Sequence, residues 1–226
     1  MNSVKRGLQF LVSLLFPLLV ITCVLRLALT PLFIQVEYRL PGFPQDIHGF
    51  TTAERIEWAQ VSINYLLERV PQEEFNRQTL PDGSPLFNSR ELAHMLDVRI
   101  LTALVMRIWL GLSLFYLFLL AVSLRQQWMR DFLRALHSGA LFTFLLIGLI
   151  LLGVWLNFEA LFTQFHLLLF EGDTWLFYLS DNLIRLFPMH FWRDLFIFIG
   201  ACVLLLCALV VCLWRSLSKR ERQKAH

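Results

Sequence analysis

The stretch that decides the fold runs from Ala140 to Phe158 and reads ALFTFLLIGLILLGVWLNF. It carries no charged side chain, and a helix needs about 20 apolar residues to cross the hydrocarbon core of a bilayer. The 226-residue chain is 57% hydrophobic with a mean hydropathy of +0.60, an apolar share well above that of a soluble domain. The stretch therefore predicts a transmembrane helix in an integral membrane protein.

Three further stretches have the length and composition of membrane spans: Leu8–Leu29, Ile100–Leu124 and Leu195–Trp214. The first is too long for the apolar core of a signal peptide, and Pro31 follows it where a cleavage site would need small residues. We therefore expect a retained anchor. The predicted fold class is an all-α membrane protein with four transmembrane helices, in which residues 1–226 form a single integral membrane domain.

The distribution of Lys and Arg predicts the orientation of the spans. Basic residues precede span one, lie between spans two and three, and follow span four (Lys5, Arg6; Arg125, Arg130, Arg134; Arg215, Lys219, Arg220, Arg222, Lys224). Because cytoplasmic flanks of spans are enriched in Lys and Arg, both termini are predicted to be cytoplasmic. The segments 31–99 and 159–194, which carry most of the acids, are predicted to be extracytoplasmic.

The first extracytoplasmic segment, 31–99, is too long for a simple connection, so we expect it to fold into a helical cap. Thr51 with Glu54 matches the capping box that begins a helix, and Asn88 with Glu91 gives a second such pattern. The helix that begins near Asn88 is predicted to continue directly into span two.

Three ionisable residues share one face of that helix. Arg90, His94 and Asp97 are four and three residues apart, which places them one above the other. His94 is therefore predicted to stand about one turn from an acid that could orient it. Ionisable groups at the edge of a membrane are costly, so they are candidates for a functional role.

The second extracytoplasmic segment, 159–194, is unusually apolar. Leu161–Phe170 and Thr174–Pro188 are too short to span a bilayer and too apolar for an exposed loop, so we expect re-entrant or interfacial helices. The first contains His166, and Asp181 and Arg185 lie four residues apart on the second. Such helices could form a lateral cleft that admits acyl chains.

Several classes of chemistry have no support in the sequence. We find no serine nucleophile elbow, no phosphate-binding glycine loop and no zinc motif, and all four cysteines lie inside apolar spans. A formal charge of +3 is too small to argue for a nucleic acid partner. What remains is acid–base catalysis by His94 and His166, both predicted to face outward; the alternative for each is a structural histidine, which is the more usual role for a helical histidine such as His94.

Several strings of residues, taken in combination, resemble the lipoprotein intramolecular transacylase family of bacterial integral membrane proteins. They are Tyr38-x-x-Pro41-Gly42-Phe43 with Gly49-Phe50-Thr51, Asn88-x-Arg90-Glu91-x-x-His94-Met95-x-Asp97-Val98, Phe165-His166, Gly172-Asp173-x-Trp175 and Asp181-x-Leu183-Ile184-x-Leu186-Phe187-Pro188. The likeness covers nearly the whole chain.

The resemblance implies an acyl migration within one lipoprotein molecule in the bacterial cytoplasmic membrane, with the active site facing outside. The sn-2 acyl chain of the S-diacylglyceryl group would move to the α-amino group of the N-terminal Cys. It implies that His94 and His166 are essential, that the partners are diacylglyceryl-modified lipoproteins and membrane lipids, and that no cofactor is needed.

Our hypothesis is that His166 is the general base and that His94, oriented by Asp97 or Asp173, is the acid or electrostatic partner; the reverse assignment stays open. The candidate substrate-binding residues are Arg90, Asp97, Asp173, Trp175, Asp181, Arg185 and Asp46. The main alternative is a non-catalytic lipid- or lipoprotein-binding accessory protein. A transporter subunit has little support, because the spans lack a central row of polar residues.

Overall fold

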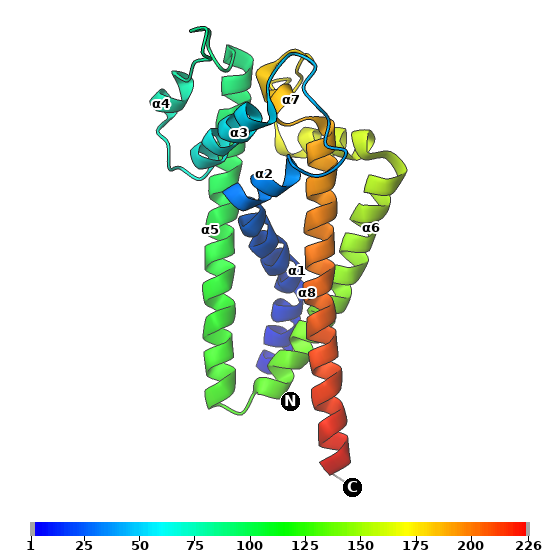
Figure 1. The fold of residues 1–226 in the computed structure, drawn as a ribbon. Helices are drawn as coiled ribbons and strands as arrows, with labels where there is room; N and C mark the ends of the chain where they lie inside the picture. The colour runs from blue at the N-terminus through cyan, green and yellow to red at the C-terminus, as the bar shows by residue number, and fades with distance from the viewer. Residues whose placement is uncertain (1–2, 225–226) are drawn as a thin grey trace. The chain divides into compact units, whose positions relative to one another are not determined.

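The computed structural model describes residues 3–224, which form eight helices, labelled in Figure 1. Four of them are long: α1 (Ser3–Ala28), α5 (Ser89–Arg125), α6 (Met129–Leu169) and α8 (Met189–Lys224). Each has the length and hydropathy to cross a membrane, and each contains one predicted span. The prediction of an all-α membrane protein with four spans is therefore confirmed.

The chain divides into two compact units. Unit 1 comprises Met1–Arg26, Arg107–Gly153 and Ile197–His226, and unit 2 comprises Leu27–Met106 and Val154–Phe196. The two segments that we expected outside the membrane, 31–99 and 159–194, both fall within unit 2.

Unit 1 is held together by close helix packing at small residues. A Cβ atom added at Gly139 of α6 would lie 2.6 Å from Cβ of Phe16 in α1, and the Ser13 hydroxyl of α1 donates to the Ala135 carbonyl of α6 at 2.9 Å. On the α8 side, a Cβ at Gly200 would lie 2.7 Å from the Leu151 side chain. Small residues that let backbones approach are the usual means of packing helices in lipid.

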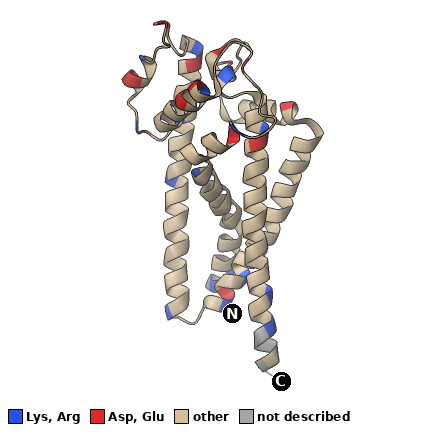
Figure 2. Cartoon of the chain, viewed as in Figure 1, with Lys and Arg blue, Asp and Glu red and all other residues tan. Residues whose placement is uncertain are grey.

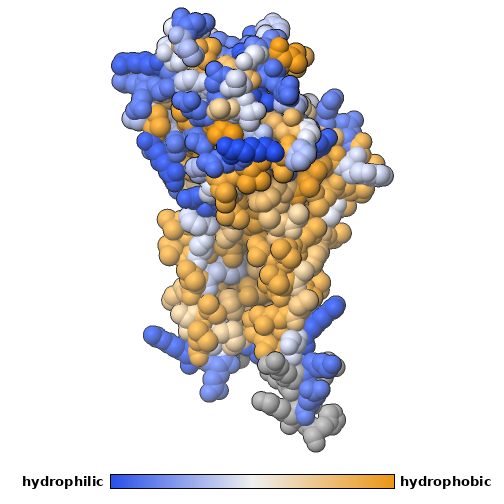
Figure 3. All heavy atoms as spheres, in the orientation of Figure 1, coloured by the Kyte–Doolittle hydropathy of each residue, from blue (hydrophilic) through white to orange (hydrophobic). Residues whose placement is uncertain are grey.

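The surface of unit 1 is apolar along the spans. Figure 3 shows mainly hydrophobic side chains over the spans on the face in view. The exposed apolar residues of unit 1 include Leu114, Phe118, Leu145, Leu149, Leu205 and Leu209. Apart from Arg107, midway along α5, the charged residues of unit 1 lie nearer the helix ends (Figure 2). This pattern is that of a surface that faces lipid.

Unit 2 contains four shorter helices: α2 (Pro31–Glu37), α3 (Thr52–Leu66), α4 (Gln72–Asn76) and α7 (Asn182–Leu186). They pack with the ends of the long helices around a second core, whose fully buried members include Ile34, Tyr65, Phe75, Leu86 and Leu186. The core brings together residues from both predicted outer segments.

Both predicted helix starts in unit 2 are confirmed. Thr51 and Glu54 form a reciprocal capping box at α3. At α5, the Asn88 side chain accepts from the backbone N–H of Glu91 at 3.1 Å, and the Asn88 N–H donates to the Glu91 carboxylate at 2.7 Å. α5 then continues without interruption through span two, as expected.

The second outer segment departs from the prediction. Leu161–Leu169 is not a separate helix but the end of α6, beyond a kink at Asn157, whose φ and ψ are −162° and 91°. The prediction of a helix over 174–188 was wrong in extent, because only Asn182–Leu186 is helical there. The Asp181 carboxylate accepts from the Tyr178 N–H at 2.8 Å, a local bond that favours a turn over a helix.

Candidate active site

The two candidate histidines meet inside unit 2. His94 comes from the second turn of α5 and His166 from the last turn of α6, and their ring centroids lie 5.9 Å apart with the planes inclined by only 28°. Each residue keeps only 6% of its surface exposed. Two buried imidazoles from distant parts of the sequence therefore stand face to face.

A backbone carbonyl group determines which ring nitrogen of His166 carries the hydrogen. Nδ1 of His166 lies 2.8 Å from the carbonyl oxygen of Phe162, one turn earlier in α6. A carbonyl can only accept, so Nδ1 carries the hydrogen and Nε2 of the neutral ring keeps a free lone pair. A ring held in this way presents Nε2 as a base.

His94 lacks such a partner. Its Nδ1 is buried, and it makes no hydrogen bond with the described part of the chain. The ring packs edge-on against Phe170 and Phe177, with centroids 5.0 and 5.4 Å away. Burial among aromatic rings disfavours a charged imidazolium, and a buried nitrogen without a partner is costly. Both facts fit a group whose partner arrives with the substrate.

Trp175 completes the cluster of aromatic side chains around His166. Its ring centroid lies 5.1 Å from that of His166, and its indole Nε1 is buried without a hydrogen-bond partner among residues 3–224. The chain returns from α6 to Trp175 through Gly172, whose φ of +75° is readily adopted by glycine. Trp175 was predicted from the sequence as a substrate contact; the structure places it beside His166, and the contact itself stays a prediction.

The phenylalanine side chains around His166 were not predicted from the sequence. Phe162, Phe165 and Phe170 surround His166 with centroids 4.2, 5.5 and 5.5 Å away. Phe162 and Phe165 lie near the end of α6 and Phe170 follows directly after it. Their closeness to His166 in the sequence was visible, but phenylalanine is abundant throughout the chain, so this signal did not single them out.

The expected contact between His94 and an acid does not form. Asp97 instead accepts from the Thr174 hydroxyl at 3.2 Å, and Asp173 is exposed in the turn before Trp175, where its backbone carbonyl accepts from Leu176 N–H. Asp97 lies three residues beyond His94, but its side chain is engaged across the chain. It therefore ties α5 to the turn that carries Trp175.

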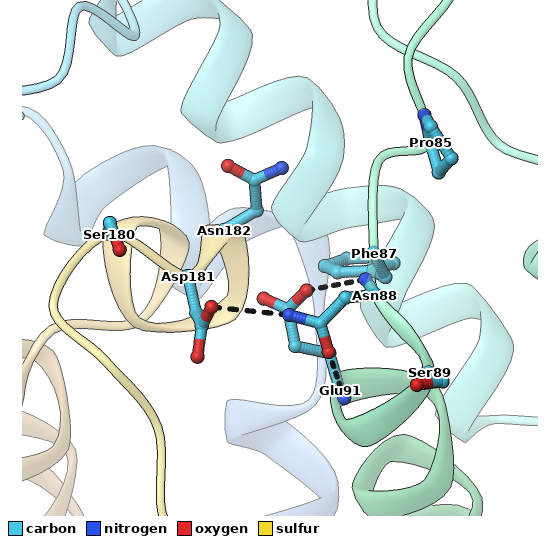
Figure 4. A pocket seen from close by; sticks show the side chains of 8 residues that line it. All are labelled: Pro85, Phe87, Asn88, Ser89, Glu91, Ser180, Asp181 and Asn182. Atoms are coloured by element: carbon cyan, nitrogen blue, oxygen red, sulfur yellow. Dashed lines mark hydrogen bonds between the residues drawn. The ribbon is translucent and has the colours of Figure 1, made fainter.

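A polar cavity of about 370 Å³ lies at the start of α5, shown close by in Figure 4. It is lined by Pro85, Phe87, Asn88, Ser89, Glu91, Ser180, Asp181 and Asn182. The Asn88 amide donates to Asp181 at 3.2 Å, and Glu91 accepts from the Leu183 N–H at 2.6 Å. These two hydrogen bonds beside the cavity join the start of α5 to α7. Arg90, exposed nearby, donates to the Leu176 carbonyl at 3.1 Å.

Two predicted substrate contacts form an ion pair with each other. Arg185 donates to Asp46 at 2.9 Å, and both side chains are buried, with 12% and 4% of their surface exposed. Burial alone would raise the pKa of Asp46, but hydrogen bonds from Arg185 and from the Phe50 N–H hold it below its ordinary value. The guanidinium also lies 3.6 Å from the centroid of Phe50. The pair fastens the loop at Asp46 to α7.

A second titratable cluster lies elsewhere in unit 2. His190 and Arg193 contact the Asp194 carboxylate at 3.0 and 3.1 Å. Glu37, at the end of α2, is buried against Asp194, and the pKa of Glu37 is raised to about 7 by burial and by the charge of Asp194. The described residues contain no group of three or more His, Cys, Asp or Glu side chains that could hold a metal ion.

The conserved pattern of the lipoprotein intramolecular transacylase Lit family matches residues 10–192. The chain belongs to this family. Lit proteins are lipoprotein intramolecular transacylases, so this family member is an integral membrane acyltransferase that transfers an acyl group within a lipoprotein. The family resemblance predicted from the sequence is confirmed.

Relatives of this Lit family member cover almost its whole length. An uncharacterized protein of Aquifex aeolicus (strain VF5) is 30% identical over 210 residues, which cover 92% of this chain and 93% of the relative. The in meso structure of the membrane integral transacylase Lit from Bacillus cereus superposes with a TM-score of 0.74 at 20% identity, over 99% of this chain and 100% of that one.

A second Bacillus cereus Lit structure carries a histidine-to-arginine mutation. It superposes with a TM-score of 0.63 at 21% identity, over 98% of this chain and 95% of that one. At these identities the likeness to the solved structures establishes the fold, which agrees with the four long helices described above.

Proposed function

We propose that this Lit family member moves the sn-2 acyl chain of an S-diacylglyceryl lipoprotein onto the α-amino group of its N-terminal Cys, and that His94 and His166 carry the proton transfers. The observation that supports this assignment is the pair of buried imidazoles 5.9 Å apart, with Nε2 of His166 left as an acceptor. The product is an N-acyl, S-monoacylglyceryl lipoprotein.

The reaction needs three proton transfers and no redox step. The α-ammonium first loses a proton to give the neutral amine. The amine nitrogen attacks the ester carbonyl and loses a second proton, so that a C–N bond forms as the C–O bond to glycerol breaks. The glycerol oxygen then takes up a proton as it leaves. Ester and amine become amide and alcohol, so the mass of the lipoprotein is unchanged.

His166 is assigned as the base. With Nδ1–H donating to the Phe162 carbonyl, the free Nε2 can accept the proton of the attacking amine. The carbonyl then stabilises the imidazolium that forms, since the hydrogen bond strengthens as the ring gains charge. Burial keeps the ring neutral beforehand, which is the state that a base requires.

His94 is assigned as the acid or as a hydrogen-bond donor to the developing oxyanion. Its buried Nδ1, which has no partner among the described residues, can form a hydrogen bond with a substrate group that reaches the histidine pair. Nε1 of Trp175 is a second unpartnered donor beside His166. A buried donor pair without solvent competition stabilises a tetrahedral intermediate well.

Positioning contributes the rest of the acceleration. The amine and the ester belong to one molecule, so holding them together converts the reaction into a unimolecular step and needs no acyl-enzyme. Asp97, Asp173, Asp181 and Arg90 stay predicted contacts for the polar part of the lipoprotein. We further propose that the site faces the extracytoplasmic side of a bacterial cytoplasmic membrane, because the flanking Lys and Arg residues lie on the opposite ends of the spans.

The test is mass spectrometry of a model lipoprotein from a host that lacks N-acylation, expressed with the parent protein or with a histidine variant. We expect the parent to move one acyl chain from glycerol to nitrogen at unchanged mass, which fragmentation of the N-terminal peptide detects. His94→Ala and His166→Ala should each lower the rate by about 10²- to 10⁴-fold.

His48→Ala is the matched control, because His48 is an exposed histidine of unit 2 that is not part of the histidine pair. Its variant should retain parental activity. Full activity of His166→Ala, with the protein present in the membrane at the parental level, would overturn the assigned roles. A lipoprotein that keeps its free amine with the parent protein would support a non-catalytic lipoprotein-binding role instead.

A further inference from the structure

Unit 1 contains a basic cavity that the transacylase chemistry does not use. Its volume is about 480 Å³, and it lies between the first turns of α6 and the last part of α8. It is lined by Arg130, Arg134, Trp214, Arg215, Ser218 and Lys219.

The charge of this basic cavity selects an anion. Among the described residues that line it, Arg130, Arg134, Arg215 and Lys219 are cations and none is an acid. Arg134 pairs with Asp131 at 3.3 Å, but the Arg134 side chain still exposes 47% of its surface. The cavity also lies at the N-terminal end of a long helix, where the helix dipole favours negative charge.

The apolar surroundings of the cavity select a lipid over a free anion. The Trp214 ring lies 6.0 Å from the Arg134 guanidinium carbon and 5.8 Å from the His137 ring, an arrangement typical of the boundary between lipid and water. Immediately before Trp214 in α8, Leu205, Leu209 and Leu213 are exposed at four-residue intervals and so form one apolar stripe. A ligand with a phosphate head and acyl tails matches both features.

We propose that the basic cavity binds the phosphate of an anionic phospholipid, whose acyl chains lie along the exposed leucine stripe of α8. Arg and Lys at a membrane surface attract anionic headgroups, and basic pockets between transmembrane helices are sites for them. Ser218 can add a hydroxyl donor to the phosphate oxygens. The residues of this site belong to unit 1, whereas the histidine pair belongs to unit 2.

The experiment measures lipid retention by native mass spectrometry of the full chain released from nanodiscs. Parallel discs contain phosphatidylglycerol or phosphatidylcholine with identical acyl chains. The parent protein should retain phosphatidylglycerol in preference. Arg134→Gln combined with Arg215→Gln should lower that retention by about 30-fold, because each basic side chain in contact with the bound phosphate contributes about fivefold.

The matched control combines Lys5→Gln with Arg125→Gln. Both are exposed cations of unit 1 outside the cavity, so this variant loses the same charge and should retain lipid like the parent. Ser218→Glu gives a second variant with one substitution, which places a carboxylate in the cavity and should also abolish the preference.

Three outcomes would overturn the proposal. One is equal retention of the two lipids by the parent protein. Another is an equal loss of phosphatidylglycerol in the control and in the cavity variants, which would indicate a diffuse charge effect. The third is displacement of the lipid by millimolar inorganic phosphate, which would make the cavity a site for a soluble anion. None of these readouts depends on acyl transfer, so failure here leaves the proposed function standing.

Discussion

The hydrogen bond between Nδ1 of His166 and the Phe162 carbonyl gives the two histidines different chemistry although their rings are parallel neighbours. One imidazole has a fixed tautomer, and the other has a buried nitrogen with no partner among the described residues. For His166 as the proposed base, a main-chain carbonyl takes the place of the carboxylate that usually orients a catalytic histidine, and no side-chain substitution can remove it.

Amide substitutions should separate the two roles. A Gln amide can donate a hydrogen bond but cannot take up a proton at neutral pH, so His166→Gln should be as inactive as His166→Ala. His94→Gln should retain at least about tenfold more activity than His94→Ala if His94 acts as a donor to the oxyanion. The measurement is the initial rate of acyl transfer at equal protein level. Greater activity in His166→Gln than in His94→Gln would reverse the assignment.

The sequence singled out His94, His166 and Trp175 because polar or amphipathic side chains stand out in an apolar setting. It could not predict that Asp97 would turn to Thr174 instead of His94, since helical spacing says which residues share a face but not which contact each side chain makes. The phenylalanines around His166 could not be predicted for the opposite reason, because an apolar residue in an apolar chain carries no distinguishing signal.

At the scale of elements, α5 depends on its first turn. Glu91 is 1% exposed, and its two carboxylate oxygens accept from the Asn88 N–H at 2.7 Å and the Leu183 N–H at 2.6 Å. One side chain thus caps the helix that carries His94 and fastens α7 to it. Helix starts of this kind were predictable, because a capping box is a local pattern; the contact with Leu183 was not, because it joins distant parts of the chain.

Glu91→Ala should lower the stability of unit 2 by about 2–4 kcal/mol, since it leaves two backbone donors without their acceptor. Thermal unfolding in detergent measures this effect. Glu91→Gln keeps one acceptor oxygen and should lose less. Ser89→Ala, an exposed change in the same turn, is the control and should unfold like the parent. An unchanged transition in Glu91→Ala would contradict the dual role.

The incorrect helix prediction over 174–188 has a physical cause. Leu, Phe and Tyr in this segment give the hydropathy of a helix, but the turn after Asp173 and the bond between Asp181 and Tyr178 compete with helical hydrogen bonding. Composition reports how apolar a segment is, whereas its backbone follows whichever hydrogen bonds are available locally.

At the scale of the molecule, the four spans and their apolar surface could be predicted from the sequence alone, because an apolar run of about 20 residues satisfies its own backbone in lipid as a helix. The assembly of 31–99 with 159–194 into unit 2 could not, since neither segment carries a pattern that names its partner. The raised pKa of Glu37 is a product of that assembly, because it is caused first by burial and then by the charge of Asp194, which belongs to the other segment.

The pKa of Glu37, raised from 4.5 to about 7, makes stability depend on pH. Between these values the folded state binds more protons than the unfolded state, so stability falls as the pH rises from about 4.5 to 7 and then levels off. Glu37→Gln should remove this fall and raise the Tm at pH 8 by on the order of 5 °C relative to the parent.

The measurement for Glu37 is the Tm in detergent from pH 5 to 8. Glu73→Gln is the control, because the Glu73 side chain is 88% exposed, and its Tm should follow that of the parent at every pH. If the parent and Glu37→Gln curves run parallel across this range, Glu37 is not the titrating group.

The kink at Asn157 has one more consequence. The Asn157 side chain accepts from the Ala160 N–H at 3.0 Å and so starts a fresh helical segment, and the boundary between units 1 and 2 lies a few residues earlier, after Gly153. We infer that the kink lets the part of α6 before Asn157 adapt to the membrane without disturbing the part that carries His166. We expect the rate of acyl transfer to be insensitive to membrane thickness, and Asn157→Leu, which favours a straight helix, to make it sensitive. Rates in vesicles of short- and long-chain lipids would show whether this joint buffers the enzyme against the membrane in which it works.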